Sequence, residues 1–360
     1  MSYQINIEKI KVSKWDASEM KNPPFGKHYT DHMFIADFAD GQWSDCRIVP
    51  YENLSLSPAT FALHYGQSIF EGMKAYKKAD GTPMLFRPDQ NLKRINISAA
   101  RMGMPEIPAE IFNNALHELL LLDQKWIPDA EGSSLYIRPF MFAADEFIGI
   151  RPTVKFKFVI ICSPAGLYYS KPVRVLVSDE YVRAFPGGVG FAKAAGNYGA
   201  CMLPLQEAQT KGFDQVLWMD GIEQKYVEEI GTMNVFFMMD GKLVTPELDG
   251  TILDGVTRMS TIQIARANNI EVIERHITID EILDSYKRGT LTDAFGTGTA
   301  ASIAPISLLG YHDQILNLPE VESRTVCHLL KKQMDEIKTG VAADQWNWTV
   351  EIKNATASIV

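Results

Sequence analysis

The sequence predicts a mixed α+β protein built from two domains. Its 360 residues exceed the length at which one hydrophobic core usually stops growing. Segments with helical periodicity and segments that alternate like strands occur in both halves. Residues 163–172 are bounded by prolines and interrupt both patterns, which is typical of an interdomain connection. We therefore predict a small α/β domain over residues 1–164, a linker over 165–173 and a larger, strand-rich domain with helices over 174–360.

The elements of the first domain follow from local patterns. Asp80-Gly81 predicts a tight hairpin turn before a strand over 83–86. Asp89 is suited to cap a helix, and Arg94 lies off the apolar face of that helix, where it could reach another partner. That face consists of Leu92, Ile95, Ala99 and Met102. A second helix is indicated by Ile111, Ala115, Leu119 and Leu122, and strands are predicted over 134–139 and 154–162.

The second domain begins with strands. They are predicted over 173–177 and 215–219, and tight turns are predicted at Asp220-Gly221 and Asp240-Gly241. One helix opens near Thr257 with Met259, Ile262 and Ala265 facing inward. The last helix carries Val326, Leu330, Met334 and Ile337 on one face and ends before Gly340.

Composition favours a protein that acts on small molecules in the cytoplasm. The net charge is −9, with acidic and basic residues interspersed, so no basic face for nucleic acid or membrane lipid is evident. No apolar run approaches the roughly 20 residues of a membrane span, and the N-terminal residues lack a signal-peptide core. The four cysteines are far apart, so we predict neither a zinc or other metal site nor a disulfide framework.

Lys193 is the strongest candidate for a reactive amine. It lies in a glycine-rich stretch, residues 187–199, among small and apolar neighbours. Burial among such neighbours disfavours the charged amine, as a Schiff-base lysine requires. Glycine also lets the backbone approach a cofactor closely. A lysine in such a loop is, however, often only a solvated turn residue.

Other segments offer what a pyridoxal-type cofactor needs besides an amine, namely a carboxylate for its ring nitrogen and an anion site for its phosphate. Glu229 lies between the apolar residues Val227 and Ile230, two positions before a glycine, although a surface position at a strand end is an equal possibility. The phosphate could bind at the helix start in 254–258, where backbone N–H groups are unsatisfied and Thr257 adds a hydroxyl. Residues 296–302 could form a second anion nest, and Arg94 could add a permanent positive charge.

These residues resemble a known family, the branched-chain amino acid aminotransferases, which are pyridoxal-phosphate enzymes of fold type IV. The resemblance runs from about Phe25 to Ile352. The matching motifs are residues 25–27 with 30–33, 63–66 with 70–72, 134–139, Lys193 with 196–199, 229–234, 255–258 and 298–300. It implies a small α/β domain and a larger pseudo-barrel domain, amino-group transfer between leucine, isoleucine or valine and 2-oxoglutarate by ping-pong kinetics, and a homodimer.

The resemblance also implies roles for individual residues. Lys193 would form the Schiff base with pyridoxal phosphate and carry the proton during turnover, and Glu229 would pair with the ring nitrogen. Tyr198 would bind the phenolic oxygen. The remaining cofactor-binding residues would be Arg94, Val256, Thr257 and Thr299 around the phosphate, with Thr232 nearby. The substrate would meet Phe25, Tyr65, Phe70, Tyr136, Arg138, Ile150, Tyr168, Thr299 and Ala300, with Arg138 helping to accommodate the glutamate side chain.

Several alternatives stay open at this stage. D-amino acid aminotransferase and aminodeoxychorismate lyase share the lysine and glutamate arrangement of the fold, although the segments around Tyr65 and Tyr136 favour the branched-chain family. A nucleotide-binding protein is a remote alternative, because the stretch around Lys193 lacks the spacing of a P-loop. Mammalian relatives carry a Cys-x-x-Cys redox pair after the segment that corresponds to 298–300. This chain has Ala301 and Ala304 there, so we expect no thiol switch.

Overall fold

The computed structural model describes residues 3–353 and divides the chain into two compact units. The first unit contains the chain up to Tyr168 together with the segment from Glu336 onward, and the second contains Tyr169–Asp335. The sequence analysis placed the C-terminal segment in the larger domain. It belongs to the first unit because its strand β18 (Thr349–Glu351) pairs antiparallel with β6 (Pro83–Phe86).

The first unit is built on one largely antiparallel sheet. Its strands follow the order β1 (Asn6–Ile7), β3 (Gln42–Pro50), β2 (His32–Ala39), β8 (Phe156–Ala165), β7 (Ser134–Ala143), β5 (Met73–Lys77), β6 and β18, with β4 (Ser68–Phe70) also paired to β7. Strands β7 and β8 are longer than predicted, and β8 runs through residues 163–165. The first residues of β7, Ser134 and Leu135, pair there with Ala165 and Pro164. This tertiary pairing continues the strand through the segment where the prolines predict a break.

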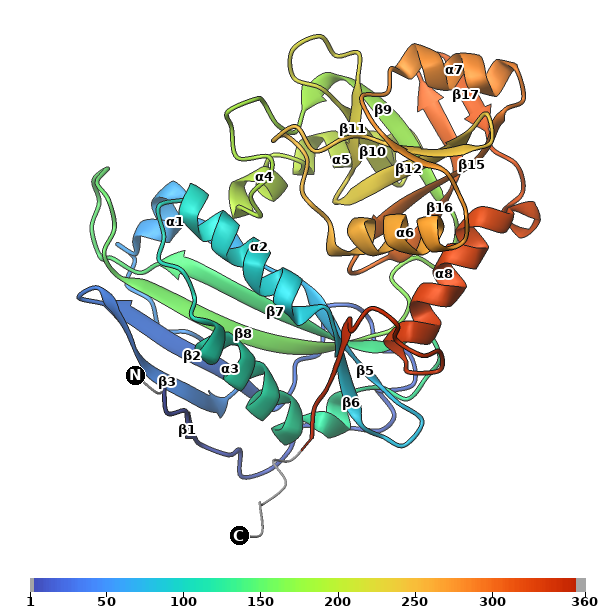
Figure 1. The fold of residues 1–360 in the computed structure, drawn as a ribbon. Coiled ribbons are helices and arrows are strands. Elements are labelled where there is room, and N and C mark those ends of the chain that lie inside the picture. The colour runs from blue at the N-terminus through green and yellow to red at the C-terminus, as the bar shows by residue number, and fades with distance from the viewer. Residues whose placement is uncertain (1–2, 354–360) are drawn as a thin grey trace. The chain divides into compact units, whose positions relative to one another are not determined.

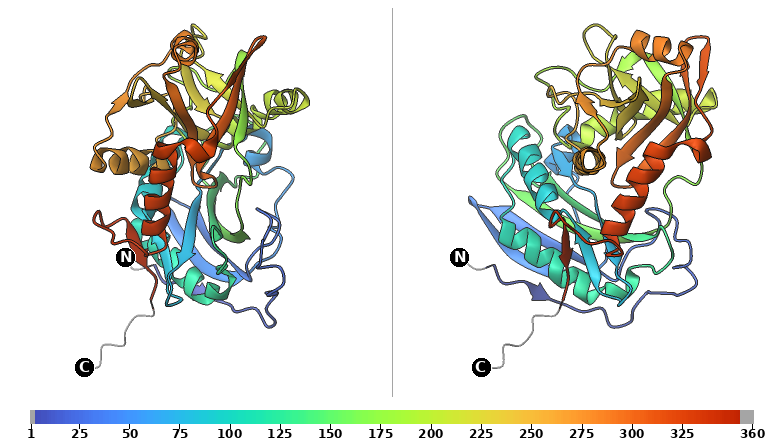
Figure 2. Two further views of the ribbon diagram at one scale, coloured as in Figure 1. Left: turned by 90° about the vertical axis from the view of Figure 1, so that its right-hand side faces the viewer. Right: turned by 45° about the vertical axis from the view of Figure 1, so that its right-hand side comes forward.

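Two helices, α2 (Pro88–Arg101) and α3 (Ala109–Leu122), lie along one face of this sheet (Figures 1 and 2). Phe158 from β8 forms the centre of the core beneath α3, with ring contacts to Phe34 and Phe112. The shorter helices are α1 (Phe61–Tyr65) and a 3₁₀ turn at Gln124–Trp126. The predicted cap of α2 is wrong. Arg87 is the N-cap, in a left-handed conformation, because Pro88 takes the first helical position and Asp89 falls in the first turn.

The second unit is a strand ring with helices around it. Its sheet order is β11 (Val227–Ile230), β10 (Gln215–Met219), β9 (Val173–Val182), β16 (Ser302–Tyr311), β15 (Leu291–Gly298), β12 (Met233–Met239), β13 (Lys242–Thr245) and β14 (Val272–Glu274), with β17 (Gln314–Asn317) on β16. Because β11 pairs with β12 as well as with β10, the strands from β11 to β12 close on themselves. The predicted pseudo-barrel is confirmed.

Both faces of these strands are covered. On β10, Val216 and Trp218 pack with α5 (Met202–Thr210), whereas Leu217 joins the cluster that contains α7 (Ile279–Lys287). Helix α6 (Val256–Ala267) packs on β15. The remaining helices are α4 (Ala195–Gly199), a 3₁₀ turn at Val321–Ser323 and α8 (Thr325–Lys338). The predicted inward face of α6 is correct for Ile262 and Ala265, but Met259 is only partly buried.

One of the two predicted turns of the second unit is correct. Asp240 and Gly241 both have positive φ, 48° and 76°, and join β12 directly to β13. The prediction of a tight turn at Asp220-Gly221 is wrong. The connection runs as a longer loop to Val227, because the Asp220 carboxylate accepts backbone hydrogen bonds from several residues of that loop. The loop is therefore organised around one side chain.

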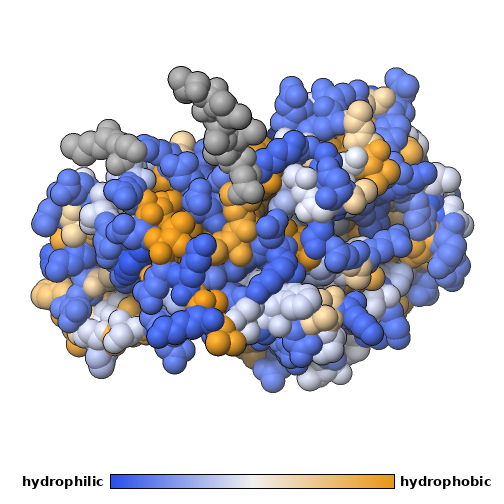
Figure 3. Space-filling model, turned by 90° about the horizontal axis from the view of Figure 1, so that it is seen from below, coloured by the Kyte–Doolittle hydropathy of each residue, from blue (hydrophilic) through white to orange (hydrophobic). Residues whose placement is uncertain are grey.

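Within residues 3–353 the helices are too short or too polar to cross a bilayer. On the face drawn in Figure 3, hydrophilic residues predominate and apolar residues form small, interrupted groups.

The closed strand ring predicts where stability is concentrated. Ile306 on β16 is fully buried in the apolar cluster, whereas Ile315 on β17 is about half exposed. Ile306→Ala should lower the free energy of unfolding by about 2–5 kcal/mol, through lost burial and an unfilled cavity. The matched control Ile315→Ala should stay within about 0.5 kcal/mol of the starting protein. Urea unfolding followed by circular dichroism measures both, and equal losses would contradict the packing described.

Candidate active site

The loop that carries Lys193 is hydrogen-bonded to the short helix α4, which follows it in the sequence. The side-chain amide of Asn197 donates to the carbonyls of Val189 and Ala192, at 2.9 and 3.0 Å. These bonds tie the residues before Lys193 to the helix that follows it. The half-buried Lys193 points its Nζ at the Tyr198 hydroxyl, 2.8 Å away. The structure thus brings together the predicted amine and the predicted phenol.

Glu229 is buried, with only 2% of its surface exposed, so the interpretation of this residue as a surface glutamate is wrong. It lies on β11 directly opposite Asn234 of β12, and paired residues of neighbouring strands project from the same face. Its Oε1 accepts the backbone N–H of Leu253 at 2.5 Å and faces the Asn234 amide at 3.4 Å. The Asn234 amide also donates to the Leu253 carbonyl at 2.9 Å.

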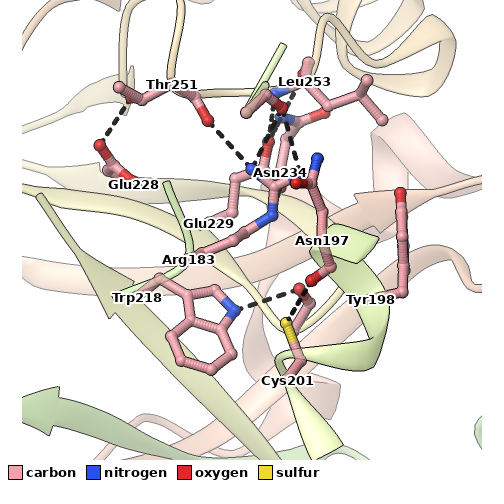
Figure 4. A network of polar contacts seen from close by, with 12 residues as sticks. Arg183, Asn197, Tyr198, Cys201, Trp218, Glu228, Glu229, Asn234, Thr251 and Leu253 are labelled. Carbon is pink, nitrogen blue, oxygen red and sulfur yellow. Dashed lines mark hydrogen bonds and ion pairs between the residues drawn. The ribbon is translucent and has the colours of Figure 1, made fainter. Parts of the chain in front are cut away.

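The second carboxylate oxygen of Glu229 faces Arg183, a residue that the sequence analysis did not identify. The Arg183 Nε lies 3.4 Å from Glu229 Oε2, and both side chains are 3% exposed. Burial, the largest single influence, acts to lower the pKa of Arg183, but Glu229 and the other acidic groups around it together raise the pKa. Figure 4 shows the guanidinium between Glu229 and the segment that contains Thr251. A buried arginine, which stays charged, is therefore paired with Glu229.

Glu228, the neighbour of Glu229 in the chain, is buried in a different environment. The Thr251 hydroxyl lies 2.6 Å from Glu228 Oε1 and 2.7 Å from Asp249 Oδ1. One hydroxyl has one proton, so it cannot donate to two carboxylates at once. The contacts are satisfied if Glu228 is protonated and donates to Thr251, which donates to Asp249. Consistently, burial raises the pKa of Glu228 to about 7.

The start of α6 offers backbone donors. The N-cap is Gly255, which has no side chain to occupy the first N–H groups of the helix. A Cβ on Gly255 would lie 2.0 Å from Asn234 Oδ1, so only glycine lets this turn rest on Asn234. Val256 and Thr257 form the first turn and are largely buried.

The other predicted residues of the second unit lie at strand ends. Thr299 and Ala300 are half-buried and follow the last residue of β15, and Thr232 is exposed in the turn between β11 and β12. Thr297 of β15 lies directly opposite Asn234, and its buried hydroxyl has no hydrogen-bond partner among the described residues. Glu229, Asn234 and Thr297 thus form a polar row across three adjacent strands.

In the first unit, five predicted substrate-binding residues form one cluster. Phe25 meets Tyr136 and Tyr168 edge to face, with ring centroids 4.8 and 5.1 Å away. The Arg138 guanidinium lies over Phe70 and donates to the Tyr136 hydroxyl at 3.0 Å. Arg138 Nε is buried with no hydrogen-bond partner among the described residues. Burial raises the pKa of Tyr168, so its hydroxyl stays a proton donor.

Two other predicted residues of the first unit lie on its surface, and a third is more constrained than expected. Tyr65 is partly exposed in α1 and contacts Phe61, and Ile150 is 89% exposed in the connection between β7 and β8. Arg94 was expected to be available to another partner. It is instead buried and bound in a fork to Glu71, with Nε and Nη2 at 2.7 and 2.9 Å from the carboxylate oxygens.

Four residues of these networks received no role from the sequence: Glu71, Arg183, Glu228 and Asn234. Glu71 and Asn234 stand inside motifs that the resemblance uses, so their positions carried a signal. Arg183 and Glu228 follow ordinary strand patterns. Their importance arises from burial beside Glu229 and Thr251, which no local pattern encodes.

The chain belongs to the class IV amino-transferase family, whose family model matches residues 68–309. Among known proteins, it is 47% identical to a probable branched-chain-amino-acid aminotransferase of Staphylococcus epidermidis, over 96% of this chain and 99% of that protein. It is 44% identical to branched-chain-amino-acid aminotransferase 2 of Bacillus subtilis, over 99% of this chain and 98% of that one.

Solved structures agree with this family. A branched-chain amino acid aminotransferase from T.th., complexed with N-(5'-phosphopyridoxyl)-L-glutamate, matches with a TM-score of 0.72 and 27% identity. The match covers 88% of this chain and 98% of that chain. The Escherichia coli enzyme matches with a TM-score of 0.73 and 25% identity, over 90% of this chain and 99% of that one. The predicted fold type IV architecture is confirmed.

The buried Glu228 predicts a pH dependence of stability. Its pKa in the folded state, about 7, lies above the ordinary value, so its contribution is fully present below about pH 4.5 and is lost as pH rises through 7. Glu228→Gln can still donate to Thr251 and cannot ionise. The starting protein should therefore lose about 2 kcal/mol more than the variant between pH 5 and 8. Urea unfolding at several pH values measures this, and parallel pH profiles would contradict a protonated Glu228.

The four cysteines predict resistance to mild oxidation. Cys46, Cys162, Cys201 and Cys327 are all buried. Burial raises the pKa of each thiol, that of Cys327 to about 12, which keeps the reactive thiolate scarce. Activity should therefore survive micromolar peroxide unchanged. A reversible loss that a thiol reagent restores would contradict this expectation.

Proposed function

We propose that the chain is a branched-chain-amino-acid aminotransferase that uses pyridoxal phosphate. It would transfer the amino group between leucine, isoleucine or valine and 2-oxoglutarate in two half-reactions. The observation that carries the proposal is that Asn234 contacts both Glu229 and Gly255, so the carboxylate and the uncapped helix start share one support. The named relatives of this chain favour this activity over D-amino acid transfer or lyase chemistry.

The donor set of the second unit fits the cofactor. Bound pyridoxal phosphate supplies an electron-accepting ring with an aldehyde that an amine can capture. Glu229 would accept the ring N–H, since the adjacent Arg183 guanidinium favours its carboxylate form. The N–H groups of Val256 and Thr257 would hold the phosphate at the start of α6. The orphaned Thr297 hydroxyl, Thr232 and Thr299 would add further polar groups. A phosphate contact of Arg94, which lies in the first unit and is bound to Glu71, rests on the family resemblance.

Lys193 would then act as both tether and proton carrier. Its Nζ already bonds the Tyr198 hydroxyl, so the amine has a defined direction before any ligand binds. The Lys193 amine would take the proton at the substrate α-carbon and deliver it at C4′ of the cofactor. The hydrogen bonds of Asn197 would hold the Lys193 loop in place while the proton is transferred. Tyr198 would also donate to the phenolic oxygen of the cofactor.

The aromatic cluster of the first unit would accept both kinds of substrate side chain. Phe25, Tyr136 and Tyr168 offer ring surface for a branched aliphatic group, whose burial contributes ~25 cal/mol per Å². Arg138 would pair with the side-chain carboxylate of glutamate. The buried Nε of Arg138 has no hydrogen-bond partner among the described residues, and an unpaired carboxylate would be costly to bury. Tyr65, Phe70, Ile150 and Ala300 would complete the substrate-binding set. We also propose a homodimer in the cytoplasm, as the resemblance implies.

Reduction with borohydride tests the cofactor and its attachment. The purified protein should show a visible absorbance band that reduction removes, and peptide mapping should place the label on Lys193. Lys193→Ala should lower the turnover number by at least about 10³-fold, because both tether and base are lost. The control Lys211→Ala replaces an exposed lysine of the same unit and should change nothing. Wild-type turnover in Lys193→Ala would remove the mechanism.

Arg138 predicts a separation between substrates. Arg138→Met should raise the KM for 2-oxoglutarate by about 10–100-fold, because a charged hydrogen bond is lost. The KM for leucine should change by less than about 3-fold, since the aromatic rings remain. Arg47→Met, which removes a partly exposed arginine paired with Asp37, is the control. Steady-state kinetics with both substrates decide the matter, and an equal effect on both would show that Arg138 only supports the fold.

A further inference from the structure

Arg183 forms hydrogen bonds to two backbone carbonyls in addition to its ion pair. Besides its ion pair with Glu229, its guanidinium donates to the Thr251 carbonyl at 2.9 Å and to the Gly190 carbonyl at 3.2 Å. Gly190 lies in the loop that leads to Lys193. Thr251 lies in the segment that leads through Leu253 to the start of α6. One buried cation therefore touches three separate parts of the candidate cofactor site (Figure 4).

The backbone segments that contact Arg183 are packed closely against each other. A Cβ on Gly190 would lie 2.3 Å from the Thr251 carbonyl oxygen and 2.6 Å from Ala184 Cβ. The Gly190 backbone thus packs closely against the Thr251 carbonyl, and the carbonyls of both residues accept from the same guanidinium nitrogen, so a group with several donors is needed there. Arginine meets this need because its planar fork presents several donors in fixed directions.

We propose that Arg183 is a positioning residue that holds Glu229 ionised and fixes the Lys193 loop and the segment before α6 around it. This inference rests on the proposed function, because it concerns how the same site holds pyridoxal phosphate. The Arg183 charge favours the state in which Glu229 is a carboxylate and the proton stays on the ring nitrogen. Arg183 contacts the Glu229 carboxylate directly, at 3.4 Å, and a ring bound through Glu229 would have that carboxylate between it and the guanidinium. Its attraction to the carboxylate therefore outweighs its repulsion of the protonated ring.

The test compares Arg183→Met with Arg183→Lys and with a matched control. Arg324 is also a buried arginine of the second unit, paired with buried Asp293 and bonded to backbone carbonyls. Arg324→Met should therefore cost similar stability without touching the cofactor site. Two quantities are measured: the Kd of the apoprotein for pyridoxal phosphate, and the NMR shift of ¹⁵N in the ring of bound cofactor.

For Arg183→Met we expect about 10–100-fold weaker binding of pyridoxal phosphate, with the ring ¹⁵N signal moved toward the unprotonated position. Arg183→Lys keeps the charge but loses the fork. It should bind the cofactor about 10-fold more weakly yet retain the protonated ring signal. Arg324→Met should match the starting protein in both measurements. If Arg183→Met fails to fold, Arg183→Lys carries the comparison of affinities.

Unchanged affinity and an unchanged ring signal in the Arg183 variants would overturn the inference, as would equal changes in Arg324→Met. These outcomes differ from failure of the proposed function. In that case the starting protein itself would bind no pyridoxal phosphate and show no visible band.

Discussion

The register of the β11–β12 hairpin determines where the polar groups of the second unit lie. Glu229 stands opposite Asn234, and Thr297 of β15 continues the row on the other side of Asn234. A slip of one residue would turn these side chains to the opposite face of the sheet. The turn favours this register because Gly231 has a positive φ, 52°, which glycine adopts without strain. Two strands and one glycine thereby align the carboxylate with the helix that follows.

The charge state of the buried groups depends on this alignment. Arg183 faces Glu229, whereas the carboxyl group of Glu228 contacts the Thr251 hydroxyl. If Glu228 were ionised as well, Arg183 would stand near two carboxylates and its attraction to Glu229 would be divided. A protonated Glu228 leaves one cation with one anion. The neighbouring glutamates of β11 thus have different partners: Glu229 faces a guanidinium, whereas Glu228 contacts a hydroxyl and has a raised pKa.

Local patterns could predict much of the site and little of what supports it. The glycine-rich loop of Lys193, the hairpin of Glu229 and the helix start at Thr257 all have signals within a few residues. Arg183 has none, because its importance comes from backbone carbonyls that the fold brings to it from Gly190 and Thr251. The C-terminal segment was assigned to the larger domain for the same reason. Its pairing with β6 joins residues more than two hundred positions apart, and periodicity cannot reveal such a partner.

Each unit keeps a buried arginine–glutamate pair, Arg94 with Glu71 and Arg183 with Glu229. Buried ion pairs contribute little net stability, because desolvation of two charges offsets most of their attraction, and apolar replacements are often more stable. Stability alone therefore does not explain why Arg183 and Glu229 are paired beside the candidate site residues of the second unit, or why Glu71 holds Arg94 in the first. A buried pair instead fixes the orientation of its side chains, because each charged group has one orientation in which its hydrogen bonds are satisfied. Their presence argues that this fold gives up some stability to keep two charged groups aimed.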